Sequence, residues 1–313
     1  MRNKLIIFTL LLLLSPAVRA QETYLYAQRD TCELFLDIYR PAEGSETTFQ
    51  GIQKPTILFI FGGGFVSGSR NDKFNLPWYQ KVTDDGYTLI AIDYRLGMKG
   101  YEMGKGFSGL YRSCTQFETA QQMGVEDLFS AIQFLLVNQE ELGIDPNNIV
   151  VCGSSAGAII TLAAAYALAR SEAQNYGLPE DYRFRGIMPF SGAIISTHGA
   201  PTFPQDPCPV LLFHGTADKI VSYRHLGTIL RGNWGSSHIA TNFARKGYPY
   251  VFYRFKDKGH EVAAYMEVMW DKEKDFLEHD VMLGEQRTID ETIDDAEGLP
   301  DWEWGGASLK SLY

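Results

Sequence analysis

The sequence contains few cysteines, and their spacing does not suit a metal site. Only Cys32, Cys114, Cys152 and Cys208 occur in 313 residues, whereas zinc sites place Cys or His ligands in close pairs. We therefore expect no metal. Four cysteines allow three complete pairings, and Cys32 with Cys114 is the favoured pair if one forms. Cys152 lies in an apolar stretch and is expected to be a buried free thiol.

Long apolar runs are absent beyond the first fourteen residues. Arg2 and Lys4 precede an apolar run over residues 5–14, and residues 18–20 (Val-Arg-Ala) place small side chains at a cleavage site. This arrangement is typical of a secretory signal peptide, here residues 1–20. The alternative is a membrane anchor, but the run is short for the roughly 20 residues that a span needs. No cysteine follows the cleavage point to carry a lipid. We expect a secreted or periplasmic protein without a stable membrane anchor.

Basic residues are scarce relative to acidic ones. The chain has 28 Lys and Arg against 38 Asp and Glu, a formal net charge of −10. An acidic surface repels nucleic acid and anionic lipid, so neither is expected as a partner. The alternative interpretation is that the charge only maintains solubility. The sequence carries no signal for an oligomeric state.

Internal repeats and Pro-rich linkers are also absent, so one domain over residues 21–283 is the simplest organisation. Short continuous apolar runs, typical of strands buried on both faces of a parallel sheet, alternate with helical patterns. The expected strands are 32–39, 55–61, 87–94, 148–152, 186–190, 209–213 and 250–255, and the expected helices are 125–142, 156–170 and 261–279. This alternation predicts an α/β fold with a doubly wound, mostly parallel sheet.

Two stretches lack this periodicity. Residues 97–122 are rich in Gly and aromatic residues, and we expect them to form a loop on the substrate side. Residues 284–313 are acidic and contain Trp302 and Trp304. We expect this segment to be a surface tail or a partly ordered extension of the domain.

A candidate nucleophile lies where a buried strand meets a helix. Residues 153–157 (Gly-Ser-Ser-Ala-Gly) follow the strand 148–152 and lead into the helix 156–170. In this context a G-x-S-x-G sequence indicates a nucleophilic serine, here Ser155. The chain must reverse sharply, so a glycine two residues on either side of Ser155 provides room, and the helix N-terminus favours negative charge. The alternative is a turn in which a serine only caps the helix.

The other members of a serine-hydrolase triad follow in the order that such a fold requires. Asp218 comes after the strand 209–213, and His260 follows the last strand after a short turn. His260 is the predicted base that removes the Ser155 proton, and Asp218 is predicted to orient its ring. His214 is expected to fix the loop before Asp218 by hydrogen bonding.

Two other residues compete for these roles. His198 follows a strand end and is the rival base, but it precedes Asp218 in the chain. Glu261 is the alternative acid, but it is the residue next to His260, so its carboxylate is poorly placed to orient the imidazole ring.

A glycine-rich loop supplies candidate hydrogen-bond donors. Residues 62–64 are all glycine and follow the strand 55–61. Backbone amides in such a loop stabilise the oxyanion of acyl transfer, and one donor contributes about 2.7–4 kcal/mol. We predict an oxyanion hole formed by the amides of Gly63 and Gly64, joined by that of Ala156. A phosphate-binding loop is the alternative, but neither G-x-G-x-x-G nor a Walker lysine is present.

Together these motifs resemble the esterase and lipase branch of the α/β-hydrolases that carries an HGGG-type oxyanion loop. This branch includes hormone-sensitive-lipase-like carboxylesterases and acetyl esterases. The matching residues occur in family order over roughly residues 30–280 and are Gly62-Gly63-Gly64-Phe65, Asp93-Tyr94-Arg95-Leu96, Leu142-Gly143-Ile144-Asp145-Pro146, Gly153-Ser154-Ser155-Ala156-Gly157, His214-Gly215-Thr216-Ala217-Asp218 and Gly259-His260. The resemblance implies an eight-stranded, mostly parallel sheet, an acyl-enzyme intermediate and no cofactor.

The sequence departs from the family pattern at three places. Phe61 stands where the family usually has His, Ala158 replaces a common Gly, and residues 97–99 (Gly-Met-Lys) replace an Ala-Pro continuation. Support of the oxyanion loop is therefore expected to differ. Phe65 and Tyr94 are expected to line the substrate pocket, with a place in the core as the alternative.

The expected function is a secreted serine esterase that acts on a small-molecule or polysaccharide-linked ester. Few residues precede the first strands, so the long N-terminal cap helices of many lipase relatives look absent, which favours short acyl chains or bulky exposed esters. The alternatives are an acetyl or feruloyl esterase of plant polysaccharides, a serine peptidase of the same fold, and a catalytically inactive binding module. Such peptidases usually carry a large additional domain, and the intact Ser, Asp and His set argues against an inactive module.

Overall fold

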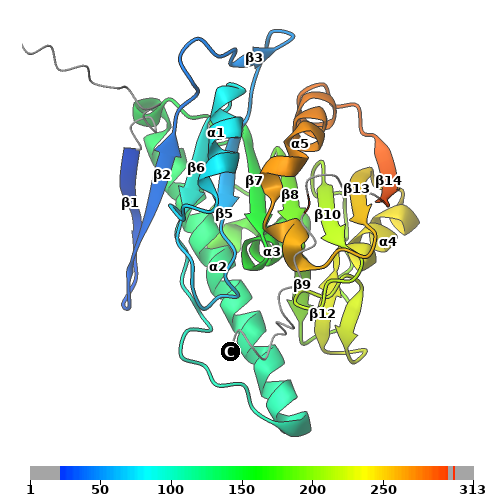
Figure 1. The fold of residues 1–313 in the computed structure, drawn as a ribbon. Coiled ribbons are helices and arrows are strands. Elements are labelled where there is room, and N and C mark those ends of the chain that lie inside the picture. The colour runs from blue at the N-terminus through cyan, green and yellow to red at the C-terminus, as the bar shows by residue number, and fades with distance from the viewer. Residues whose placement is uncertain (1–21, 295–298, 300–313) are drawn as a thin grey trace, which may run out of the picture.

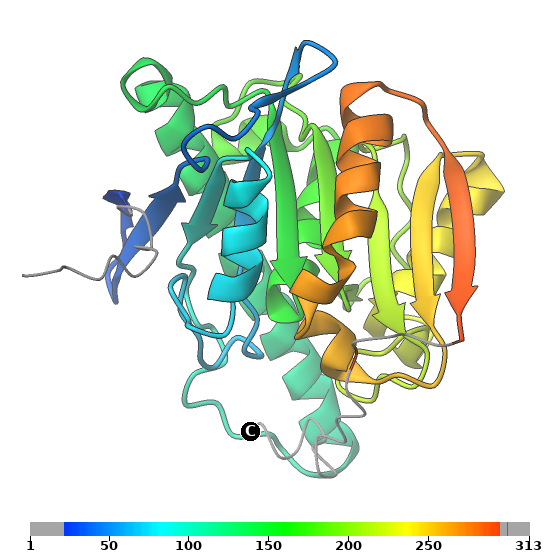
Figure 2. The same ribbon diagram turned by 45° about the horizontal axis from the view of Figure 1, so that its top comes forward.

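A β-sheet lies between two layers of helices in the computed structural model of the protein, which describes residues 22–294 and 299 (Figure 1). Helices α1 (Leu76–Asp84) and α5 (Trp270–Phe276) cover one face of the sheet, as Figure 2 shows. The other face is covered by α2 (Gly106–Leu142), α3 (Ala156–Ala169) and α4 (Ser236–Lys246). This is the doubly wound α/β architecture that the alternating pattern predicts.

The main sheet contains nine strands in the order β1-β2-β6-β5-β7-β8-β10-β13-β14. Their bounds are β1 Glu22–Gln28, β2 Glu33–Tyr39, β6 Leu89–Ile92, β5 Thr56–Ile60, β7 Ile149–Ser154, β8 Gly186–Phe190, β10 Leu211–Gly215, β13 Tyr250–Phe255 and β14 Thr288–Ile293. β1 pairs antiparallel with β2, and β2 with β6, whereas every pair from β6 to β14 is parallel. The fold class is confirmed, with one strand more than the resemblance implies.

Shorter elements fill the connections. They are the 3₁₀ helices η1 (Ala173–Tyr176), η2 (His260–Ala263) and η3 (Met266–Met269), the π-helix η4 (Leu277–Met282), the hairpin of β3 (Thr48–Phe49) and β4 (Ile52–Gln53), and a small sheet of β11 (His225–Gly227), β12 (Gly232–Gly235) and β9 (Ala193–Ser196). The helix predicted over residues 261–279 is thus divided among η2, η3, α5 and η4. The small sheet lies next to α2, on the side where the parallel strands end (Figure 1).

The predicted strands are all present, with ends that differ by at most two residues. Every residue of β5, β6, β7, β8 and β10 is buried, which explains why these strands show continuous apolar runs and no alternation. Helix α3 packs on them and buries every residue except Tyr166.

Helix α2 corrects the prediction of a loop over residues 97–122. The helix begins at Gly106, so it takes up most of that segment. Its N-terminal half is held by polar contacts to a distant strand: the Gln121 side chain exchanges two hydrogen bonds with the Ile195 backbone, at 2.8 and 3.0 Å. The Glu118 carboxylate accepts the amide and hydroxyl of Thr197. Tertiary contacts of this kind stabilise a helix that has no apolar periodicity of its own.

The expected tail over residues 284–313 contributes a strand to the sheet. β14 pairs in parallel with β13 along its whole length, from Thr288 beside Tyr250 to Ile293 beside Phe255. The placement of domain boundaries at residues 20 and 283 stays a prediction. The signal peptide, Trp302 and Trp304 lie outside the described residues.

All four cysteines are free thiols, so the favoured pair of Cys32 and Cys114 does not form. Cys152 is fully buried in β7, as expected. Burial raises the pKa of its thiol well above the usual value, because the thiolate would have to lie in an apolar interior.

One carboxyl group is buried between the helices on the α1 face. Glu273 of α5 has no exposed surface, and its two oxygens lie 3.1 Å from Nε1 of Trp78 on α1. Burial raises the pKa of Glu273 well above the usual value, since one indole N–H does not replace the hydration of a carboxylate.

We therefore predict that Glu273→Gln reduces the pH dependence of stability. The folded protein keeps a proton that the unfolded chain releases above its ordinary pKa of 4.5, so stability falls as the pH rises past that value. Between about pH 5 and 8 the melting temperature should fall for the unsubstituted protein and change less for the variant. Differential scanning fluorimetry measures both, with exposed Glu140→Gln as the control. Parallel curves for the protein and Glu273→Gln would contradict the prediction.

Candidate active site

The predicted site residues come from strands that end at the same edge of the sheet. β7 ends at Ser154, directly before Ser155, and β10 ends at Gly215, shortly before Asp218. β13 ends at Phe255 and leads through a short turn to His260. Because these strands are parallel, their carboxyl ends lie together, which is where open α/β sheets place ligand-binding residues.

The three side chains form a hydrogen-bonded chain. Nε2 of His260 lies 2.8 Å from Oγ of Ser155, and Nδ1 of His260 lies 2.8 Å from Oδ2 of Asp218. Each residue is more than nine-tenths buried, with 8–9% of its surface exposed. This is the geometry in which an imidazole removes a hydroxyl proton while a carboxylate orients the ring.

Ser155 occupies a strained turn between β7 and α3. Its backbone has φ 53° and ψ −113°, outside the regions that L-residues ordinarily adopt. A methyl group on Gly153 would lie 2.3 Å from the carbonyl oxygen of Gly157, and one on Gly157 would lie 2.0 Å from that of Ile60. Glycine at both positions is therefore required for space, as predicted.

Asp218 is held in an ionised state by donors on every side. Its Oδ1 accepts the amides of Ile220 and Val221, at 2.9 and 3.0 Å. Burial alone would raise the pKa of Asp218, but the adjacent rings of His260 and His214 hold it well below the usual range. The carboxylate therefore remains negative throughout the pH range in which the protein would work.

The turn that carries His260 is tied to the end of β7 and to the loop after β10. The Ser154 hydroxyl donates to the Ala263 carbonyl at 2.7 Å, and the Ala217 amide donates to the Lys258 carbonyl at 2.9 Å. Glu261 accepts the Gly259 amide at 2.6 Å, so this carboxylate closes the turn. Ser154 occupies the first x position of G-x-S-x-G, where any residue is allowed, so no sequence signal marks its role.

Of the competing residues, His198 is exposed and forms no bond with Ser155. His214 fixes the acid loop, as predicted: Nε2 lies 3.1 Å from the Val221 carbonyl and Nδ1 lies 2.8 Å from Oγ of Ser236.

The glycine loop lies against the nucleophile. A methyl group on Gly62 would lie 3.2 Å from Cβ of Ser155. Gly63, Gly64 and Phe65 have φ values of 116°, 64° and 65°, so the loop runs through the left-handed region that glycine favours. The loop therefore lies beside the turn in which Ala156 follows Ser155 at the start of α3. The role of the Gly63, Gly64 and Ala156 amides stays a prediction.

Phe65 and Tyr94 lie in the core beneath this loop. They are only 1% and 3% exposed, which favours the core alternative over a place on a pocket wall. The Tyr94 hydroxyl donates to the Phe61 carbonyl at 3.1 Å, and the Tyr94 ring stacks on Phe61 with centroids 4.5 Å apart. Phe61, which replaces the family histidine, therefore supports the loop through an aromatic stack.

Arg70 anchors the far end of the loop and was not identified from the sequence. Its guanidinium lies 2.6 Å from Asp93 and 2.9 Å from the buried carboxylate of Asp37, and the Tyr79 hydroxyl donates to its carbonyl. An isolated arginine in a Gly- and Ser-rich segment gives no sign that two acidic residues from distant strands will meet it.

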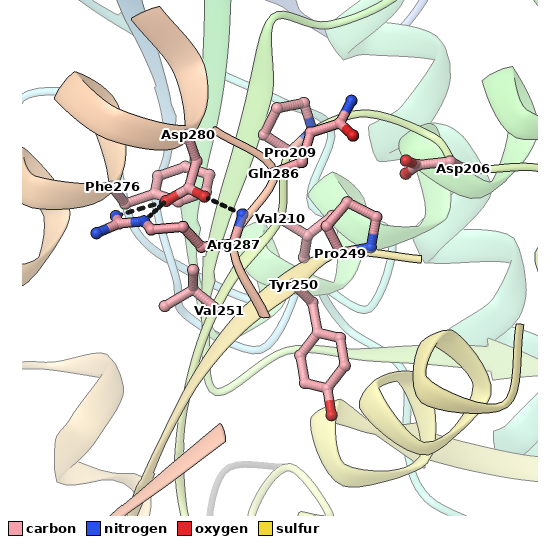
Figure 3. Close-up of a pocket in the computed structure, with 10 residues that line it drawn as sticks. All are labelled: Asp206, Pro209, Val210, Pro249, Tyr250, Val251, Phe276, Asp280, Gln286 and Arg287. Carbon is pink, nitrogen blue, oxygen red and sulfur yellow. Dashed lines mark hydrogen bonds and ion pairs between the residues drawn. The ribbon is translucent and has the colours of Figure 1, made fainter. Parts of the chain in front are cut away.

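Two hollows flank the strands. One of about 40 Å³ lies at the opposite ends of β10 and β13 from the triad and is lined by Val210, Tyr250, Asp280 and Arg287, among others (Figure 3). A wider hollow of about 470 Å³ borders Asp218, with Thr216 and Tyr223.

Within residues 22–294, no cluster of His, Cys, Asp or Glu is arranged to hold a metal ion. No helix in this region has the length and apolar character needed to cross a bilayer.

A profile of the carboxylesterase family matches residues 15–196, more than half of the chain, including the glycine loop and the nucleophile turn. The chain belongs to the carboxylesterase family. Its curated relatives include chlorogenic acid esterase of Aspergillus niger, 28% identical over 172 residues (54% of this chain and 27% of that protein). Fumonisin B1 esterase of Sphingopyxis macrogoltabida is 28% identical over 135 residues (40% and 21%). The chain spans about a quarter of the length of these relatives.

Solved structures extend the likeness over most of the carboxylesterase chain. Native esterase 2 of Thermogutta terrifontis has a TM-score of 0.58 at 20% identity and covers 86% of this chain and 96% of its own. The same esterase phosphorylated by paraoxon has a TM-score of 0.56 at 21% identity, with 85% and 96% covered. At this identity the likeness establishes the α/β-hydrolase fold of the whole described region.

We predict that Gly157→Ala destabilises the carboxylesterase fold by about 1–3 kcal/mol. The added methyl would meet the Ile60 carbonyl oxygen, a backbone atom that cannot move without disturbing β5. The control is Gly186→Ala, whose methyl would meet a Val281 side-chain methyl at 3.0 Å, and that side chain can adjust. Urea denaturation followed by circular dichroism gives both free energies of unfolding, and equal values would be inconsistent with a backbone collision at position 157.

Proposed function

We propose that this protein is a serine esterase that hydrolyses carboxylic esters through a Ser155–His260–Asp218 triad. The observation that carries the proposal is the pair of 2.8 Å contacts that joins the three side chains at the carboxyl edge of the sheet. Membership of the carboxylesterase family supports the same reaction class.

In the first half of the reaction, His260 removes the Ser155 proton as Oγ attacks the ester carbonyl. Asp218, which stays negative, stabilises the imidazolium that forms. The tetrahedral oxyanion is bound by the proposed donors, the amides of Gly63, Gly64 and Ala156. His260 then protonates the departing alcohol, which leaves an acyl group on Ser155.

In the second half, His260 removes a proton from water, and the resulting hydroxide attacks the acyl carbon. The carboxylic acid leaves as Ser155 regains its proton. The position of Gly62 against Ser155, and the exposure of Gly63 beside it, support this loop as the HGGG-type oxyanion hole. No step needs a cofactor, because the triad supplies both the nucleophile and the proton transfers.

The proposed substrates are esters of short acyl chains, either small molecules or acyl groups attached to polysaccharide. The chlorogenic acid esterase among the relatives motivates an aromatic acyl ester in the test panel, and the structures of esterase 2 with propionate and butyrate motivate short aliphatic ones. The signal-peptide pattern of residues 1–20 supports export, so we propose a secreted or periplasmic location. Mass spectrometry of the exported product would test cleavage after Ala20.

We predict that Ser155→Ala and His260→Ala each lower kcat for p-nitrophenyl acetate by roughly 10⁶-fold, and Asp218→Asn by roughly 10⁴-fold. The smaller loss for Asp218→Asn reflects its indirect role. Initial rates and labelling by a fluorophosphonate measure the effect, with Ser108→Ala, an exposed serine on α2, as the control. No turnover and no labelling of the unsubstituted protein would favour an inactive binding module.

We also predict that kcat/KM is higher for p-nitrophenyl acetate and butyrate than for the laurate. Each ester is used below its critical micelle concentration, so that the substrates differ only in chain length. Acetate or ferulate released from xylan, measured by chromatography, would identify a polysaccharide substrate. A preference for laurate would contradict the short-chain proposal.

A further inference from the structure

A second imidazole lies next to the carboxylate of the triad. His214 is completely buried in β10, four residues before Asp218. Its Nε2 is 3.1 Å from the Val221 carbonyl oxygen and 3.4 Å from Oδ2 of Asp218, and its Nδ1 is 2.8 Å from Oγ of Ser236 at the start of α4. The ring therefore connects the acid loop to the start of α4.

The neighbours of the ring determine where its proton lies. A carbonyl oxygen and an ionised carboxylate oxygen only accept hydrogen bonds, so Nε2 has to carry a hydrogen to face both. A neutral imidazole has a single N–H, which leaves Nδ1 as an acceptor. The Ser236 hydroxyl can supply the matching donor: its oxygen lies 2.8 Å from Nδ1 and 3.2 Å from the Gly192 carbonyl oxygen, so its one proton is shared between these two acceptors.

The distances also favour a neutral ring. Charge-assisted contacts between a cationic nitrogen and a carboxylate are usually about 2.7–2.9 Å long. The Nε2 to Asp218 separation of 3.4 Å is longer, and the shorter contact of Asp218, at 2.8 Å, is made with Nδ1 of His260. Asp218 thus directs its short contact to His260 and only a longer one to His214.

Hydrogen bonds connect His214 to Val221 and Val221 to Asp218. The His214 N–H donates to the carbonyl of Val221, and the amide of the same Val221 donates to Oδ1 of Asp218. A shift of His214 would move Val221 and, with it, the carboxylate. Oδ2 of Asp218, which orients His260, would then be displaced.

We propose that His214 is a positioning residue for the reaction: a neutral imidazole, protonated on Nε2, that holds Asp218 in line with His260. The proposal rests on the proposed esterase function. Because the ring is neutral, it does not compete with the imidazolium of His260 for the negative charge of Asp218 when that imidazolium forms.

Two substitutions distinguish the roles of Nδ1 and Nε2 of His214. The amide nitrogen of Gln reaches the position of Nε2, so His214→Gln keeps a donor toward Val221 and Asp218, whereas Asn reaches only the position of Nδ1. We expect His214→Asn to lower kcat for p-nitrophenyl acetate about 10²-fold with little change in KM, as a misplaced catalytic group does. His214→Gln is expected to recover most of this loss.

A role in packing alone predicts a different result. Both variants would then lose activity in step with their melting temperatures, and neither would be favoured for its hydrogen-bond donor. Equal activity of the Asn and Gln variants, or a rise in KM in place of the fall in kcat, would overturn the proposal.

The tautomer can be read on the unsubstituted chain, and a variant is needed only to assign the His214 signal. A long-range ¹H–¹⁵N correlation spectrum of the imidazoles distinguishes an Nε2–H ring from an Nδ1–H ring and from an imidazolium. His214 is the ring whose Nδ1 signal shifts in Ser236→Ala. An Nε2–H pattern at neutral pH is expected, and either of the other two patterns would overturn the proposal. A chain that hydrolyses no ester would instead refute the proposed function, and the spectrum would still decide the state of His214.

Discussion

Close contacts between backbones determine where the reactive side chains lie, and glycine makes these contacts possible. The α-carbon of Gly157 lies so near the Ile60 carbonyl that a methyl group would be 2.0 Å from it, and the same addition at Gly215 would be 2.3 Å from the carbonyl of Gly259. The first contact sets the nucleophile turn and α3 against β5. The second sets the turn of His260 against the strand that leads to Asp218. The two short hydrogen bonds of His260 depend on both approaches.

Burial has opposite consequences for two carboxyl groups of this protein. Glu273 faces one indole N–H and no cation, so removal from water raises its pKa. Asp218 is also buried, but it receives two backbone amides and lies between two imidazoles, and its pKa is lowered. The groups that face each carboxyl, set against the cost of burial, decide the direction of each shift. A negative charge is therefore favoured at Asp218, beside His260, and disfavoured at Glu273, between α1 and α5.

Support for the site extends well beyond the three triad residues. Ser154 ties the base turn to the nucleophile strand, and Arg70 ties the glycine loop to Asp37 and Asp93. Phe61, between β5 and the same loop, stacks on Tyr94. Each contact joins segments that are far apart in the chain, so a site of few reactive atoms is held by much of the domain.

The sequence by itself determined the layered α/β fold, seven of the nine strands of the main sheet and the chain order of Ser155, Asp218 and His260. Buried parallel strands must be apolar on both faces, and a sharp strand-to-helix turn needs small residues, so both leave local patterns that can be read. Only tertiary structure decided the N-terminal half of α2, strands β1 and β14, and the contacts of Arg70 and Ser154. Their hydrogen bonds and ion pairs join residues distant in sequence, and a polar residue looks the same in a chain whether its partner is water or another strand.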